Sequence, residues 1–155
     1  MRTLTLSTAL ILALALAAPA VGQSAQAIQG PLTDVGSTDG RTFFVAGEPT
    51  AQNGQATMWL WHVYHAPQAL GAVQIDARAE RLSIDCTART MTRTRWENYS
   101  GAVVQASGDM NSGPLHAAPG NETDRMVAVA CGEDYPGKGQ GLRFATLEAA
   151  IADFR

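Results

Sequence analysis

Two histidines three residues apart are the first side chains whose types and spacing could do chemistry. His62 and His65 lie in the apolar run ATMWLWHVYHAP, residues 56–67. On a helix this spacing would place both imidazoles on one face, where they could bind one metal ion. The Trp, Val and Tyr content instead favours a strand, in which these two side chains point to opposite faces. We therefore expect a half-buried strand rather than a metal site, and His116, in a loop-like stretch, does not change this by its spacing.

Motifs of the common enzyme classes are missing from the sequence. There is no Gly-x-Ser-x-Gly nucleophile elbow and no Cys-x-x-Cys pair. Lys138 is followed by Gly139 rather than by Ser or Thr, so the stretch EDYPGKGQG is not a phosphate-binding loop. Glu133 and Asp134 lie beside a glycine, where a solvated pair is expected rather than two catalytic carboxylates. The sequence predicts a protein that is not an enzyme and has no metal or cofactor.

A basic and aromatic segment is the one surface feature that could bind a ligand. From residue 78 to residue 95 the chain carries five cations and two anions, a local charge of plus three. Such a patch could attract an acidic protein or a sulfated glycan. The alternative is a solvated sheet face on which arginine stems cover their neighbours. The ligand-binding candidates are Arg89, Arg93, Arg95, Trp96 and Tyr99.

The charge of the whole chain excludes general nucleic-acid binding. There are 11 basic and 14 acidic residues, which give a formal net charge of −3 at pH 7. Nucleic-acid-binding domains are usually basic overall. An acidic or envelope protein, and possible self-association as a homodimer, remain compatible with this balance.

The N-terminal residues have the layout of a secretory signal peptide. Arg2 precedes an apolar run from about Leu4 to Leu16, which is too short to span a membrane, and small residues follow. We expect cleavage after Ala20 or as late as Ala27, within a signal region of residues 1–27. No cysteine follows either position, so a lipid anchor on an N-terminal cysteine is not expected. Residues 28–40 are predicted to be a flexible lead-in, and residues 41–155 one domain.

The two cysteines of the chain predict one disulfide. Export to an oxidising compartment favours a Cys86–Cys131 bridge over two free thiols. Closing this loop would stabilise the fold by about 4 kcal/mol in the chain-entropy model.

Alternating and helical patterns define the expected elements. Strands are predicted at 41–46, at 56–65, in AVQIDA, on both sides of a turn near Arg89–Thr92, and from Gly101. APQALG is expected to be a loop, and Cys86 to face the core from a strand together with Leu82 and Ile84. Asn121 and Thr146 are helix N-cap candidates, and Gly132 is the expected stop of the first helix. The fold class is α+β: an antiparallel β-sheet with short α-helices packed on one face and one disulfide.

Several short motifs also follow one another in a distinctive order. Asp85-Cys86 ends a strand, a basic and aromatic segment ends at Tyr99 before Gly101, and Pro119-Gly120 precedes a helix that contains Cys131. This order, between Thr57 and Phe154, resembles the surface-adhesin protein E-like family of small exported bacterial domains. Two features depart from the family: Leu115-His116 stands where members have a tryptophan, and the cysteine of lipid-anchored members is absent.

The resemblance implies an antiparallel sheet with short helices on one face and a role in binding extracellular or host proteins. We therefore expect an exported, non-enzymatic binding module of the cell envelope, periplasmic or secreted, with surface display as a further alternative. A structural or assembly factor that binds a bacterial partner is the first rival function. An enzyme that uses one of the three histidines is the second.

Overall fold

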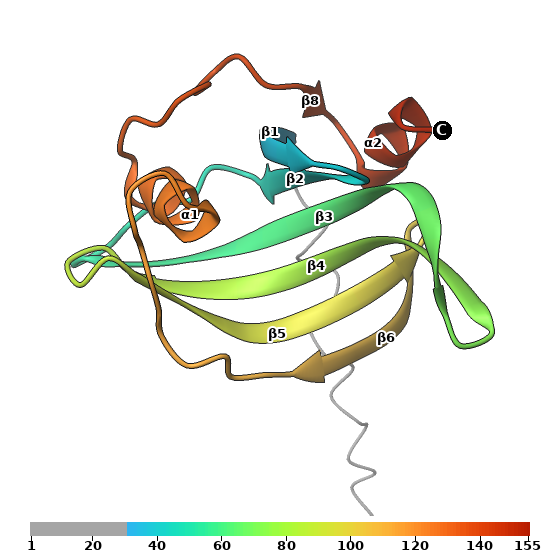
Figure 1. Ribbon diagram of the computed structural model, residues 1–155, viewed down its shortest axis with the longest axis horizontal. Coiled ribbons are helices and arrows are strands. Elements are labelled where there is room, and N and C mark those ends of the chain that lie inside the picture. Colours follow the sequence, from blue (N-terminus) through green and yellow to red (C-terminus); the bar gives the residue numbers. More distant parts are fainter. Residues whose placement is uncertain (1–30) are drawn as a thin grey trace, which may run out of the picture.

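The computed structural model describes residues 31–155, which form one antiparallel sheet and two short helices (Figure 1). The sheet order is β6-β5-β4-β3-β2-β1-β8, and β7 pairs with β5 at the same sheet. Most strands pair with their neighbours in the chain, so the sheet is largely a meander. The elements are β1 (Leu32–Thr38), β2 (Arg41–Ala46), β3 (Gln55–Leu70), β4 (Val73–Asp85), β5 (Thr90–Ser100), β6 (Val103–Asp109), β7 (Leu115–His116), α1 (Glu122–Cys131), β8 (Arg143–Phe144) and α2 (Leu147–Asp153).

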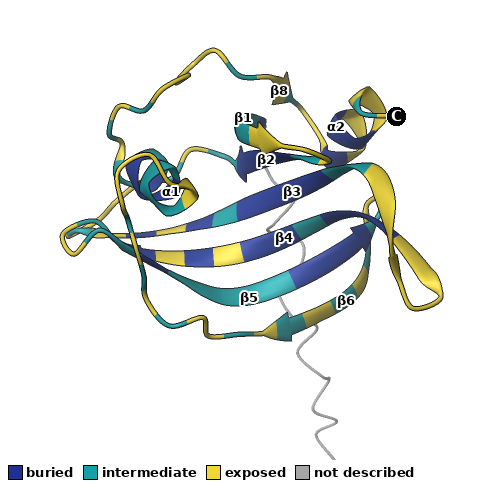
Figure 2. Ribbon diagram, in the orientation of Figure 1, coloured by how far each residue is buried: buried dark blue, intermediate teal, exposed yellow. Residues whose placement is uncertain are grey.

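Strand β3 is buried on both of its faces. Its side chains alternate as predicted, so that Met58 and Leu60 belong to one apolar cluster and Trp61 and Val63 to another. Strand β2 is divided in the same way. Figure 2 shows that buried residues dominate the middle of the sheet. A strand that is apolar in both phases needs a cover on each side.

The two helices lie on opposite faces of the sheet, so the prediction that they share one face is wrong. Helix α1 buries Met126, Val127 and Ala130 in the cluster of Leu60, and α2 buries its apolar residues in the cluster of Trp61. Each helix therefore covers the apolar cluster on its own face of the sheet. The fold is dominated by sheet, and the α+β class describes it only loosely.

Both helices begin at the N-cap residues predicted from the sequence. The Asn121 side chain accepts a hydrogen bond from the backbone N–H of Asp124, and Thr146 accepts one from Ala149. Gly132 ends α1 in the left-handed conformation, with φ of 74°. Caps are short-range features, which explains why the sequence predicts them well.

The predicted flexible lead-in, residues 28–40, contains strand β1. This strand pairs with β2 along most of its length and with β8 at Leu32 and Thr33. Its apolar residues Leu32 and Val35 are buried. The prediction is therefore wrong for these residues, because pairing with a strong neighbouring strand orders a segment whose own composition is polar and glycine-rich.

The hairpin between β3 and β4 is longer than the sequence predicted. The expected loop APQALG continues β3 as far as Leu70. The predicted strand AVQIDA forms the first half of β4, which lies in the middle of the sheet between β3 and β5. After a register shift, Gln68 pairs with Ile75 and Leu70 with Val73. Figure 1 shows this hairpin projecting beyond the other strands.

The next turn also differs from the prediction. Strand β4 ends at Asp85, whose carboxylate accepts hydrogen bonds from the backbone N–H groups of Thr87 and Ala88. The turn spans residues 86–89, so it ends where the predicted turn at Arg89–Thr92 was expected to begin, and Cys86 lies in it, partly buried, rather than on a strand. Met91 of β5 is buried on the same face as Leu82 and Ile84.

The expected signal region, residues 1–27, and residues 28–30 of the lead-in lie outside the described residues. Within residues 31–155, neither helix is both long and apolar enough to cross a membrane.

Candidate functional site

The predicted disulfide is present. Cys86, in the turn after β4, is bonded to Cys131, the last residue of α1. Their Cα atoms are 5.8 Å apart, a usual separation for a bridge. The bond therefore fixes the helix to the end of the β4–β5 hairpin.

Arg89 serves the same joint and is not part of a free basic surface. Its φ of 51° turns the chain back into β5, and its guanidinium group pairs with Asp124 at 2.7 Å and Glu133 at 2.6 Å. The hydrogen bonds that Arg89 donates to Glu133, and next those to Asp124, raise the pKa of Arg89. Asp124 lies in α1 and Glu133 follows the helix closely, so the two ion pairs of Arg89 fix the turn to the helix.

Arg95 and Tyr99 point to the α2 side of the sheet. Tyr99 is fully buried, its ring lies 4.8 Å from that of Trp61, and its hydroxyl donates to Glu97 Oε2 at 2.5 Å. Arg95 Nε donates to the other oxygen of this buried carboxylate at 3.0 Å. Burial, followed by the bond to Glu97, raises the pKa of Tyr99. Tyr99 thus has no surface that a ligand could reach.

Arg93 and Trp96 point to the α1 side of the sheet. Residues two apart in a regular strand share a face, but Arg81 pairs with Arg95 while Leu82 pairs with Arg93, so a β-bulge adds one residue between them. The five candidates from the sequence are therefore divided between the turn and two opposite faces. They do not form one binding surface.

A different group of polar side chains converges where Arg93 and Trp96 lie. Strands β2 to β5 contribute one or two residues each to this group, which we call the central polar cluster. Its members are Arg41, His62, Tyr64, Arg78, Glu80, Arg93 and Trp96.

Glu80 is the centre of the cluster. It is buried, and its two carboxylate oxygens lie 2.8 Å from Arg78 Nε and 3.0 Å from Arg93 Nε. His62 Nε2 lies 3.7 Å from the same carboxylate. Burial alone would raise the pKa of Glu80, but His62 and the two guanidinium groups together lower it to about 2. Glu80 therefore stays charged across the physiological pH range.

Aromatic rings hold the guanidinium groups in place. Arg78 lies over the ring of Trp96 at 5.3 Å, and Arg41 lies over the ring of Phe43 at 5.0 Å. Tyr64 pairs with Arg41 across β2 and β3. Burial raises the pKa of Tyr64, and the charges of Arg78 and Arg41 oppose this rise. Stacking on a ring orients an arginine and leaves its edge free for a ligand.

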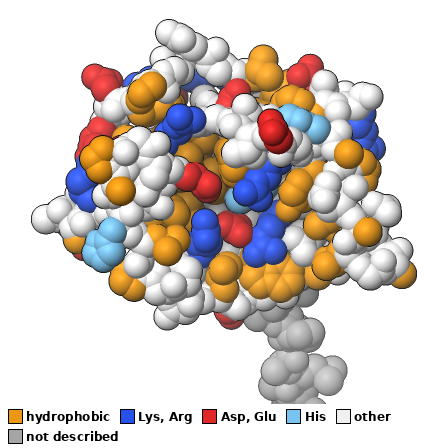
Figure 3. All heavy atoms as spheres, in the orientation of Figure 1, with side chains coloured by type: hydrophobic (Ala, Val, Ile, Leu, Met, Phe, Trp, Pro, Cys, Tyr) orange, Lys and Arg blue, Asp and Glu red, His pale blue; other side chains and the backbone are white. Residues whose placement is uncertain are grey.

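Several hydrogen-bonding atoms of the cluster are without a partner in residues 31–155. Arg78 and Arg93 approach Glu80 through Nε, and their terminal nitrogens make no hydrogen bond in this part of the chain. Both ring nitrogens of His62 are buried and make no hydrogen bond there either. Figure 3 shows cationic side chains around acidic and histidine side chains in the hollowed centre of this face. Arg78 and Arg93 flank the Glu80 carboxylate, and Arg41 adds a third cation on the same face, so the cluster carries a net charge of plus two, which suits an acidic group.

The two histidines diverge as the strand prediction required. His62 lies against the ring of Phe43, with the centroids 5.0 Å apart, whereas His65 stacks on Phe154 at 4.7 Å and approaches Thr42 Oγ1 at 3.0 Å. Among residues 31–155 no three His, Cys, Asp or Glu side chains are arranged as a metal site.

The sequence prediction missed Arg41, Arg78 and Glu80. Arg78 and Glu80 share one face of a strand with His62 opposite them, so the signal would have been the register of β3 and β4. A single sequence does not give that register, because it depends on where the hairpin turns.

Comparison with known proteins gives the family of the chain. The model of the family described as surface-adhesin protein E matches residues 32–132, from the start of β1 to the residue after α1. No curated protein and no solved structure gives a match. The sequence resemblance extended to Phe154, but β8 and α2 lie outside the matched residues. The match covers more than half of the chain, which therefore belongs to the surface-adhesin protein E family.

Proposed function

We propose that the protein is an exported, non-enzymatic binding module of the cell envelope that contacts its partner through the central polar cluster. Membership of an adhesin family supports a binding role of this kind. The Cys86–Cys131 bridge is consistent with an oxidising compartment, either the periplasm or the exterior. The signal-like N-terminal sequence supports export as well.

The single observation that carries this proposal is the excess of arginines over carboxylates in the central polar cluster. The described face presents three arginines and one carboxylate, although the whole chain has a net charge of −3. Such a local field attracts acidic groups and discriminates against basic ones. The partner is an extracellular or envelope protein with an acidic segment, and an acidic glycan presents the same chemistry.

Two of the original candidates, Arg93 and Trp96, keep their proposed role. Arg41 and Arg78 join them, because each has a stacked guanidinium group on the same face. Arg89, by contrast, is already engaged with two carboxylates. The contact surface is therefore smaller than the sequence patch and lies between strands rather than along one.

The test is a panel of immobilised matrix proteins, envelope proteins and sulfated glycans, probed with the oxidised mature protein. The informative variant is Arg41→Gln/Arg78→Gln. Arg41 pairs with no carboxylate in residues 31–155, and when Arg78 is replaced the buried Glu80 keeps Arg93 at 3.0 Å. The matched control is Arg81→Gln, an exposed arginine on a neighbouring position of β4 whose side chain faces away from the cluster.

Binding to at least one acidic ligand is expected, with an affinity that decreases as salt is added. The double variant should bind at least about tenfold more weakly, a loss of about 1.4 kcal/mol, and the control should bind like the wild type. Equal binding by the double variant would exclude the central polar cluster as the contact surface. Failure of the wild-type protein to bind any acidic ligand would exclude the function itself.

A second candidate function is supported by the outer edge of β6. Within residues 31–155 this strand pairs only with β5, and Val103 at its start is one of the most exposed large apolar side chains. An unpaired edge can add a strand from a bacterial partner or from a second copy of the chain. A face of exposed tryptophans at Trp59 and Trp61 would also favour this function. The structure does not have such a face, since Trp61 is fully buried. Sedimentation at several concentrations would detect a homodimer.

A further inference from the structure

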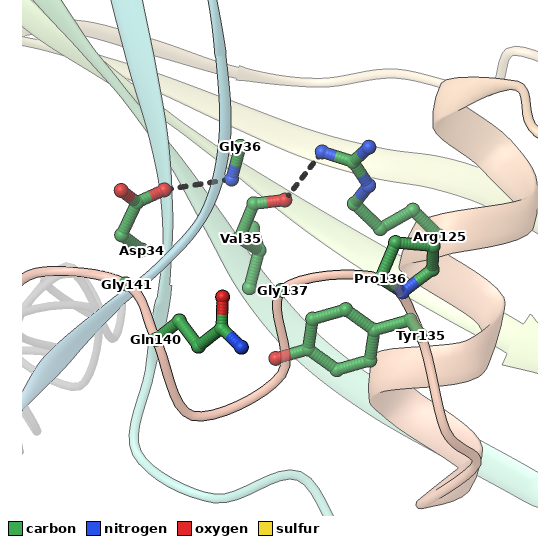
Figure 4. A pocket seen from close by; sticks show the side chains of 9 residues that line it. All are labelled: Asp34, Val35, Gly36, Arg125, Tyr135, Pro136, Gly137, Gln140 and Gly141. Carbon is green, nitrogen blue, oxygen red and sulfur yellow. Dashed lines mark hydrogen bonds between the residues drawn. The ribbon is translucent and has the colours of Figure 1, made fainter.

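A polar cavity lies between β1, α1 and the loop that follows α1 (Figure 4). Its volume is about 230 Å³. Asp34 and Val35 of β1, Arg125 of α1, and Tyr135 and Gln140 of the loop supply its principal walls. None of these residues belongs to the central polar cluster, so the cavity is a separate feature of the fold.

Two glycines allow the walls of this cavity to approach one another. Gly36 has a φ of +144° beside the β-bulge in β1, and a Cβ atom there would collide with the guanidinium group of Arg125. A Cβ atom at Gly141 would lie 2.6 Å from the backbone oxygen of Asp34. The loop can therefore close against β1 only because Gly141 has no side chain, and at Gly36 the positive φ favours glycine while an added Cβ atom would displace the Arg125 guanidinium group.

Three hydrogen-bond donors of the cavity have unused capacity. Arg125 donates through one terminal nitrogen to Val35 O at 3.0 Å, and its other nitrogens make no hydrogen bond within residues 31–155. The Tyr135 hydroxyl and the Gln140 amide are likewise without partners in these residues, and Figure 4 shows their polar ends facing each other. A guanidinium, an amide and a hydroxyl are the donors that a carboxylate ligand requires.

The charges of the cavity indicate a ligand with both signs. Asp34 and Arg125 lie on opposite sides of the lined space in Figure 4, and neither forms a salt bridge with any described residue. The Asp34 carboxylate accepts a hydrogen bond from the backbone N–H of Gly36 at 2.7 Å, which leaves lone pairs for another donor. A simple anion would be repelled by Asp34, whereas a zwitterion would satisfy both groups.

An adjoining apolar cavity indicates that the ligand also has an apolar part. It has a volume of about 320 Å³, and it shares Val35 and Tyr135 with the polar cavity. Val45, Pro49 and Val129 contribute to its lining. This volume lies at the lower end of the range for small-molecule pockets.

We propose that the two cavities together bind a free α-amino acid with an apolar side chain. The carboxylate lies against Arg125, Gln140 and Tyr135, the ammonium group against Asp34, and the side chain in the apolar cavity. This site is independent of the proposed binding of acidic partners.

The test is calorimetric titration of the oxidised mature protein with leucine and phenylalanine. Two analogues of leucine separate the contributions: 4-methylpentanoate lacks the ammonium group and isoamylamine lacks the carboxylate. Each analogue should bind at least about tenfold more weakly than leucine, because one charged wall is left without its partner. Absence of binding by both amino acids at millimolar concentration would overturn the proposal, and so would equal binding of 4-methylpentanoate and leucine.

Two substitutions locate the site. Asp34→Asn removes the negative charge from the cavity wall, and Tyr135→Phe removes only a hydroxyl group. Neither change alters the hydrogen bond from Arg125 to Val35 of β1, so both variants should fold. Both should weaken leucine binding at least about fivefold, while Asp39→Asn, in the exposed turn after β1, should not. Circular dichroism verifies that each variant is folded. Unchanged binding by both variants would contradict the site, and Arg41→Gln/Arg78→Gln should bind leucine like the wild type whether or not the proposed adhesive function holds.

Discussion

The buried hydrogen bond between Tyr99 and Glu97, both in β5, provides the sharpest test of the polar interactions on the α2 side of the sheet. Tyr99→Phe keeps the ring against Trp61 and removes only the hydroxyl that donates to Glu97. The acceptor is a fully buried carboxylate that also pairs with Arg95. The variant therefore deletes one charged hydrogen bond and leaves the apolar packing in place.

The expected loss of stability follows from the burial of both partners. A hydrogen bond to a charged group contributes about 1.5–3 kcal/mol, and a value near the middle, about 2 kcal/mol, is expected since Arg95 still compensates Glu97. For a domain of this size that corresponds to a decrease in melting temperature of about 5–10 °C. Tyr64→Phe is the matched control, because the Tyr64 hydroxyl makes no hydrogen bond in residues 31–155, and it should change stability by less than about 0.5 kcal/mol.

Urea denaturation followed by tryptophan fluorescence measures both variants under identical conditions. The slope of the unfolding free energy against urea concentration should be the same for both variants and the wild type. A shift of the urea midpoint then reports a change in stability alone. In a Glu97→Gln background the same Tyr99→Phe change should cost less, because the acceptor is neutral. A loss for Tyr99→Phe no greater than that for Tyr64→Phe would refute the assignment of this bond as a buried, charged interaction.

Three further predictions concern other parts of the fold. Cys86→Ser/Cys131→Ser should reduce the free energy of unfolding by about 2–5 kcal/mol in urea titration. Because the pKa of Glu80 is lowered to about 2 from its usual 4.5, the stability that it contributes is complete above pH 4.5 and is lost as the pH decreases toward 2, so Glu80→Gln should flatten the acid limb of a stability profile. Gly36→Ala should destabilise the protein by about 1–3 kcal/mol in thermal denaturation, more than Gly40→Ala, where an added Cβ meets no atom within 4 Å.

The features predicted correctly from the sequence depend on near neighbours or on covalent chemistry. The N-caps at Asn121 and Thr146 need only the next three residues, and the alternation in β3 needs only the side chains themselves. The pairing of Cys86 with Cys131 follows because the chain has no other cysteine. These signals do not change with the rest of the fold.

The errors arise where tertiary pairing overrides local composition. Strand β1 is ordered by β2 and β8, and its own sequence resembles a loop. The helices were expected on one face, although apolar residues at consecutive positions, such as Leu60 and Trp61, already indicate that both faces need cover. This signal lies in the sequence of β3 itself and needs no tertiary information.

The basic segment shows why charge counted along a chain differs from charge in space. Arg89 and Arg95 account for two of its five cations, and carboxylates from α1, β5 and β6 neutralise both. The bulge between Arg93 and Arg95 then places Arg93 on the opposite face, together with Arg78 of the same segment and Arg41 of β2, whereas Arg81 stays on the side of Arg95. A single inserted residue thus moves the positive field from a continuous strand to a cluster between strands. Deleting Thr94, the extra residue of this bulge, would return Arg93 to the side of Arg95 and leave Glu80 with one arginine fewer, so the bulge is itself part of the proposed contact surface.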